Sequence, residues 1–200
     1  RIPAGSLLRL EAGTRLQAPA EGGMAALVVA GRLRVDGTAG SPVELIWPPA
    51  GGPSLVLASG GTVQGRGLRM RGGGLKIERG RVELEESAFE NGSLVRVGVH
   101  GGLDLKSCRL ASGGRGLVLE APTASARLED CVVEGHSEAG IQVESAQSLL
   151  VGRTLFRKNA LDVIHRVPWD LDLRTCTWDP GSGPNIQDGA VIPGAGRVLR

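Results

Sequence analysis

A phrase of eight residues, repeated about every 22 residues, constrains the fold of this chain more than any other feature. Its third position is apolar at Leu84, Leu105, Leu128, Val151 and Leu173, so successive copies lie 21, 23, 23 and 22 residues apart. Positions 1 and 8 are also largely apolar, and position 6 is always small. The copies read VELEESAF (82–89), LDLKSCRL (103–110), ARLEDCVV (126–133), LLVGRTLF (149–156) and LDLRTCTW (171–178). A sixth, weaker copy near residue 61 places Val63 in register with Leu84.

Each copy predicts a short strand, because positions 1 to 4 alternate between apolar and polar residues as the two faces of a strand do. A second short strand follows each copy, usually after a glycine. These second strands read GLKI (74–77), GSLVRV (92–97), GLVL (116–119), GIQV (140–143) and ALDV (160–163). A βαβ unit needs about 30 residues or more, so 22 residues are too few for one. The sequence therefore predicts an all-β solenoid whose coils stack on one another.

Composition agrees with a single β domain that turns often. The chain has 32 Gly, no Tyr, two Phe and three Trp, and 41% of its residues are hydrophobic, so its core is aliphatic. We expect one β-helix domain over residues 1–200, with N-terminal coils and a cap at 1–60, regular coils at 61–178 and a C-terminal wrap at 179–200.

The cysteines point to structure rather than chemistry. Cys108, Cys131 and Cys176 all occupy position 6, so we expect a ladder of small, buried, reduced side chains shared with Ser87 and Thr154. No C-x-x-C pair is present, which argues against zinc, and the sequence indicates no metal or other cofactor. The histidines share no repeat position, which disfavours a Cys–His nucleophile. They are His100, His136 and His165.

Both ends of the chain carry a family resemblance. The opening IPAGSLLRLEAGT (2–14) is similar to the first coil of pectate-lyase-like, right-handed parallel β-helix proteins of bacterial surfaces. The next coil, LVVAGRLRVDGT (27–38) with SPVELI (41–46), resembles their continuation, and WDPGSGPNIQD (178–188) resembles their terminal wrap. The resemblance implies a right-handed parallel β-helix of about 22 residues per coil. It implies no particular activity, because this fold carries enzymes, adhesins and structural modules.

The catalytic motifs of that family's enzymes are absent from the sequence. The nearest imitation of the lyases' acidic cluster with a basic residue is Asp104, Arg127, Glu129 and Asp130 on neighbouring coils. Position 4 reads Glu85, Lys106, Glu129, Gly152 and Arg174 along the chain. Such alternation is typical of charge pairing between adjacent strands, so we favour a solubilising surface over a catalytic site.

One basic stretch and one tryptophan are candidate ligand-binding groups. The basic residues are Arg66, Arg69, Arg71, Lys76, Arg79 and Arg81. They form either a solvated face or a site for an acidic polysaccharide, since arginine binds carboxylates and sulfates in a planar, bidentate manner. Trp169 lies in a turn region after Pro168, where its ring could stack on a sugar.

Three functions remain open on the sequence. The first is a non-enzymatic extracellular or cell-envelope module for surface structure, adhesion or glycan binding. The second is a polysaccharide lyase or glycoside hydrolase with an atypical site. The third is a phage tail-spike-like module that associates through its coil ends or a flat face.

Location and partners follow from similar arguments. The chain starts at Arg1 without a signal peptide, so it looks like a processed domain whose targeting signal has been lost. A net charge of +2 disfavours nucleic acid as a partner, and no stretch is apolar enough to span a membrane. We expect an acidic polysaccharide or another cell-surface component as the partner.

Overall fold

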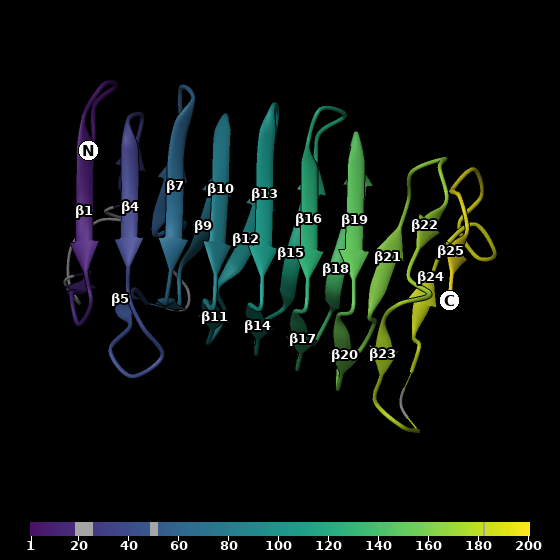
Figure 1. Ribbon diagram of the computed structural model, residues 1–200. Helices are drawn as coiled ribbons and strands as arrows, with labels where there is room; N and C mark the ends of the chain where they lie inside the picture. Colours follow the sequence, from purple (N-terminus) through teal and green to yellow (C-terminus); the bar gives the residue numbers. More distant parts are fainter. Residues whose placement is uncertain (19–25, 49–51, 182) are drawn as a thin grey trace.

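The chain folds into the predicted all-β solenoid, a parallel β-helix in which every strand pairs in parallel with the strand one turn away (Figure 1). The computed structural model describes residues 1–18, 26–48, 52–181 and 183–200. With seven or eight strands in each of three sheets, the chain makes about eight turns.

Three sheets form the walls of the solenoid, and each turn contributes one strand to each. The first sheet contains β1 (Leu7–Glu11), β4 (Arg32–Asp36), β7 (Gly61–Arg66), β10 (Gly80–Glu85), β13 (Gly101–Lys106), β16 (Ser125–Glu129) and β19 (Ser148–Gly152). The second contains β2 (Arg15–Gln17), β5 (Val43–Ile46), β8 (Leu68–Arg71), β11 (Ala88–Glu90), β14 (Arg109–Ala111), β17 (Val132–Glu134), β20 (Leu155–Arg157) and β23 (Thr177–Trp178). The third contains β3 (Leu27–Val29), β6 (Leu55–Leu57), β9 (Gly74–Ile77), β12 (Leu94–Val97), β15 (Arg115–Glu120), β18 (Ala139–Ser145), β21 (Val163–His165) and β24 (Ile186–Gln187).

The eight-residue phrase spans a corner rather than one strand. Its positions 1 to 4 belong to the first sheet, and positions 7 and 8 to the second. Position 5 turns the corner in the left-handed backbone region, with φ of 47° at Glu86, 53° at Ser107, 54° at Asp130 and 42° at Arg153. The repeat therefore sets the shape of each turn through its backbone as well as its apolar residues.

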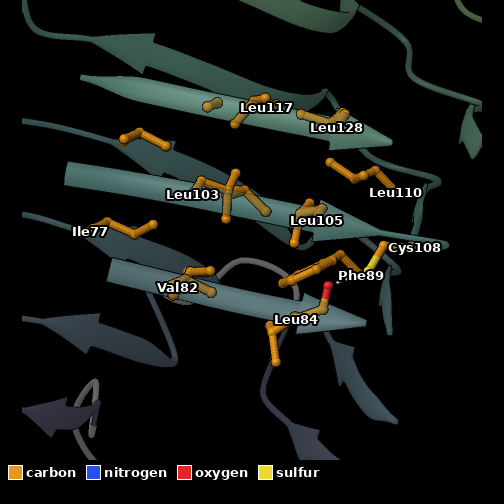
Figure 2. Close-up of a cluster of buried hydrophobic side chains, with 14 of the residues drawn as sticks. Ile77, Val82, Leu84, Phe89, Leu103, Leu105, Cys108, Leu110, Leu117 and Leu128 are labelled. Atoms are coloured by element: carbon orange, nitrogen blue, oxygen red, sulfur yellow. Dashed lines mark hydrogen bonds between the residues drawn. The ribbon is translucent and has the colours of Figure 1, made fainter. Parts of the chain in front are cut away.

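The core runs along the axis between the sheets. Leu84, Leu105 and Leu128 pair in register at position 3, and all three are buried. Figure 2 shows such side chains from the first sheet meeting those of the other walls, among them Phe89 and Leu117. Position 8 is also in register from Phe89 to Trp178, and the rings of Phe156 and Trp178 stack 4.9 Å apart.

The predicted cysteine ladder is confirmed. All three cysteines are free, Cys108 and Cys131 are buried, and Cys176 is half-buried in the last full turn. The Cys108 thiol lies 3.3 Å from the Lys106 carbonyl oxygen, and the Cys131 thiol lies 3.3 Å from the Glu129 carbonyl oxygen. Position 6 is small because its side chain folds back onto the corner.

Two predicted alignments are wrong by two residues. Val63 pairs with Val82, not Leu84, because this turn is shorter and Gly65 takes the inward position opposite Leu84. The second strand at 160–163 is displaced likewise. The repeat puts Val163 opposite Val143, but Val163 begins β21 and pairs with Ile141. The corner that leads into β21 contains two buried polar residues, Asn159 and Asp162, whose side chains hydrogen-bond at 2.9 Å.

The last turns depart from the regular stack. The phrase at 171–178 keeps its register only in the second sheet, because β22 (Leu171–Asp172) leaves the first sheet and pairs with β25 (Val198–Leu199). Ile186 in the tail pairs with Val163, so residues after 179 add strands to the final turn. The first sheet consequently ends at β19, and a hollow forms beside that strand.

Candidate binding face on the first sheet

A shallow groove of about 830 Å³ lies on the outer face of the first sheet, over β4, β7, β10, β13 and β16. Most of its side chains come from positions 2 and 4 of the repeat, which point outward because positions 1 and 3 point into the core. The charged and polar lining residues are Arg34, Asp36, Gln64, Arg66, Glu83, Glu85, Asp104, Lys106, Arg127, Glu129 and Arg153.

Neighbouring side chains neutralise most of the charge on this face. Arg153 approaches Glu129 at 2.6 Å, Lys106 approaches Glu85 at 3.9 Å, and Arg34 approaches Asp36 at 3.0 Å. The expected alternation at position 4 is thus a set of cross-strand ion pairs, although Arg153 from position 5 takes the place of the absent side chain at Gly152. The groove offers both hydrogen-bond donors and acceptors without a strong excess of either charge.

Three of the four catalytic candidates meet in this groove. Asp104 and Arg127 are register partners on β13 and β16, and Glu129 lies two residues further along β16. Asp130 lies instead at the corner, where the Arg153 guanidinium donates two hydrogen bonds of 2.7 and 3.0 Å to its carboxylate. That hydrogen-bonded guanidinium lowers the pKa of Asp130. A general acid needs the opposite shift, so the corner suits an ion pair better than proton transfer.

The groove continues toward the C-terminal end into a second hollow of about 560 Å³. Arg127 and Glu129 line both, while Leu150 and Trp169 line only the second. Of the residues that line this hollow, the sequence singled out Trp169 as a ligand-binding candidate and Arg127 and Glu129 as catalytic candidates. Leu150 was missed, although its outward position in the repeat marks it as an apolar residue on a charged face.

One turn of the solenoid distributes the basic stretch over all three walls. Arg66 lines the groove, and Arg81 forms an ion pair with Glu83 on the same face. Arg69 and Arg71 lie on the second sheet within 4.0 and 3.7 Å of Glu44. Lys76 lies on the third sheet, 2.7 Å from Glu78, and Arg79 is exposed in the turn that follows. The six side chains therefore do not converge on one site.

The buried cysteines and histidines elsewhere are held in their neutral forms. Burial raises the pKa of Cys108 to about 12 and that of Cys131 to about 11, which makes both poor nucleophiles. Burial likewise lowers the pKa of His136 and of His165. One ring nitrogen of each histidine donates a hydrogen bond to a carbonyl oxygen, that of Leu110 for His136 and that of Gly196 for His165.

No family model, curated protein or solved structure matches this chain. Across the described ranges, no three His, Cys, Asp or Glu side chains are grouped to hold a metal ion. In the same ranges, no helix is long and apolar enough to cross a membrane.

Proposed function

We propose that this chain is a non-enzymatic β-helix module of the extracellular space or cell envelope that binds an extended glycan along its first sheet. The observation that carries the proposal is the groove, which crosses five successive parallel strands. Strands are spaced about 4.8 Å apart, so the groove extends about 19 Å along the solenoid axis. A chain-like ligand fits this shape better than a compact one. The opening phrase supports a pectate-lyase-like origin for the module.

The lining chemistry suits polysaccharide hydroxyl groups. Carboxylates accept and guanidinium groups donate hydrogen bonds, and Gln64, whose amide donates to Glu83 at 2.9 Å, does both. Because these side chains are already held by their neighbours, little side-chain entropy is lost when a ligand adds further hydrogen bonds.

An acidic polysaccharide is the alternative ligand within this proposal. Arg66 and Arg127 lie in the groove, where their guanidinium groups could bind the carboxylates or sulfates of such a chain. Binding of an acidic chain would weaken steeply with salt, because exposed charges are screened over about 10 Å at 0.1 M salt.

The test is affinity electrophoresis against neutral and acidic polysaccharides at two salt concentrations. We expect at least one polysaccharide to retard the protein, and the double variant Glu83→Gln/Asp104→Asn to weaken retardation about tenfold. The matched control, Glu120→Gln/Glu138→Gln, removes two exposed acids outside the groove and should bind as the parent chain does. Equal losses in both variants, or no retardation by any polysaccharide, would contradict the proposal.

A catalytic role is the second candidate, favoured by one observation. The Asp104 carboxylate has no hydrogen bond or ion pair within the described residues, and Arg127 is the register partner of Asp104. Chain cleavage is measured as new reducing ends or as absorbance of an unsaturated product. Cleavage that Asp104→Asn abolishes would establish an enzyme and refute the non-enzymatic proposal.

A further inference from the structure

The hollow beside β19 combines two apolar side chains with a polar rim. Leu150 holds position 2 of the repeat, where its register partner on β16 is Arg127. It is 62% exposed, while its neighbours Leu149 and Val151 are buried in the core. Leu150 therefore contributes almost nothing to the core, and its apolar surface faces the hollow.

Trp169 forms the other apolar part of the hollow and is fixed in place. Its indole nitrogen donates a hydrogen bond to the Ala146 carbonyl oxygen at 3.3 Å. Its ring meets the buried His165 edge-on, with ring centroids 5.0 Å apart. The side chain is half-buried against the core yet lines the hollow, so it offers a rigid ring surface at little entropic cost.

The rim carries hydrogen-bonding groups, and two of them are acids that already accept hydrogen bonds. Arg174 binds Asp172 through two side-chain hydrogen bonds of 3.0 and 2.7 Å, and the pKa of Asp172 falls to about 2. Asp170 accepts a hydrogen bond from the Arg197 backbone amide at 2.7 Å. Gln147 adds an amide group to the rim. These acids keep free lone pairs for hydroxyl donors, but their charge is partly balanced.

We propose that this hollow binds a pyranose ring of an uncharged sugar, with one face of the ring against Trp169 and Leu150 and its hydroxyls toward Asp170, Asp172 and Gln147. A sugar ring has an apolar face and a polar edge. The hollow matches both, because Trp169 and Leu150 supply an apolar surface and polar groups lie at the rim. The volume of about 560 Å³ is in the range of small-molecule sites. The inference rests on the proposed glycan binding, of which this hollow is the specificity-determining end.

The test uses methyl β-glucoside, maltose, cellobiose and mannobiose as probes, with the indole N–H resonance of Trp169 followed by NMR. We expect at least one sugar to shift that resonance with a Kd near the millimolar range, where small sites begin to show measurable affinity. Leu150→Asp should weaken that sugar about tenfold without loss of stability, because the side chain is exposed. Val191→Asp is the matched control, since Val191 is 66% exposed and lies outside the hollow.

A second variant keeps the test decisive if Leu150→Asp unfolds the chain. Trp169→Phe keeps a ring but removes the hydrogen bond to Ala146, so it should retain weaker sugar binding. The inference is overturned if no probe sugar binds, or if Leu150→Asp leaves sugar affinity unchanged. It is equally overturned if the only effect of Leu150→Asp is a change in sedimentation, because the hollow would then be an interface between protein chains.

The two proposals fail in distinguishable ways. If polysaccharides bind and Glu83→Gln/Asp104→Asn weakens them while Leu150→Asp has no effect, only the inference about the hollow fails. If small sugars bind at Trp169 but the groove variant still binds polysaccharide normally, the extended groove is wrong and the hollow stands alone.

Discussion

At the scale of single residues, the solenoid depends on where side chains are absent as much as on where they pack. Gly65 shows this most clearly, because it occupies the inward position that Leu84 fills one turn later. Its φ is 140°, and a Cβ atom there would lie 1.8 Å from the Val35 carbonyl oxygen. In this backbone conformation a side chain at position 65 would point into the backbone of β4, so only glycine fits.

Gly65→Ala should therefore destabilise the fold by about 2–4 kcal/mol, through steric overlap and an unfavourable φ. Gly102→Ala is the control on the same sheet, because the nearest heavy atom to its Cβ would be 3.7 Å away. That variant should range from unchanged to about 1 kcal/mol more stable, since alanine restricts the unfolded chain. Urea unfolding followed by circular dichroism measures both; similar midpoints for the two variants would show that Gly65 is not required.

Also at this scale, the sequence predicted which residues share a position in the repeat, but it did not predict every shift in strand register. Cys108 and Cys131 were placed together because position 6 recurs at the same corner. Val63 was misaligned because Gly65 removes the apolar residue that would have marked the register. Within the candidate site, Asp104 and Arg127 could be brought together from the repeat alone. The proximity of Trp169 to Leu150 could not, since β22 leaves the regular stack just after Trp169.

At the scale of the elements, the second sheet is tied together by ion pairs that cross from strand to strand. Glu44 lies within 4.0 Å of Arg15 and Arg69, and Arg71 joins Glu44 to Glu90 at 3.7 and 3.6 Å. The series continues through Arg109, Glu134 and Arg157 on β14, β17 and β20. Each of these short strands makes few backbone hydrogen bonds, so the cross-strand ion pairs help to hold neighbouring strands together.

Glu134 is the most buried member of this series, so its replacement tests the contribution of the ion pairs. Its side chain is 10% exposed and contacts both Arg109 and Arg157. Glu134→Gln should cost about 1–2 kcal/mol at neutral pH, allowing for solvent screening of the two half-exposed arginines. Glu85→Gln is the control, because its partner Lys106 is 3.9 Å away and both side chains are more than half exposed. The control should change stability by less than about 0.5 kcal/mol.

The stabilisation that Glu134 provides depends on pH in a defined direction. Burial alone would raise the pKa of Glu134, but hydrogen bonds from Arg157 and Arg109 outweigh it and the pKa is lowered from 4.5. The stabilisation is therefore complete above about pH 4.5 and disappears as the pH falls through the lower folded-state value. Chemical unfolding of parent and Glu134→Gln should converge in that acidic range. A stability difference that grew on acidification would have the wrong sign.

At the scale of the whole molecule, the two ends of the solenoid differ. At the first turn, Leu8 points inward in register with the buried Leu33, yet it is 36% exposed because the described residues place no strand beyond β1. At the other end the tail adds β24 and β25 to the last turn. Asp188 holds the tail by accepting hydrogen bonds from the Ala190 and Val198 amides at 2.9 and 2.8 Å.

Removal of residues 179–200 tests whether this tail protects the last turn. The deletion takes away the strand partners of Val163 and Leu171, which are buried in the intact chain. It leaves unpaired backbone on β21 and β22 beside newly exposed apolar side chains, the combination that promotes edge-to-edge association. We expect the shortened chain to form oligomers or aggregates in light scattering at concentrations where the intact chain shows none. Asp188→Asn in the intact chain should loosen the tail without exposing the edge permanently, so its association should be intermediate. A shortened chain that stayed monomeric and unfolded at the same urea concentration as the parent would show that the regular turns alone close this end.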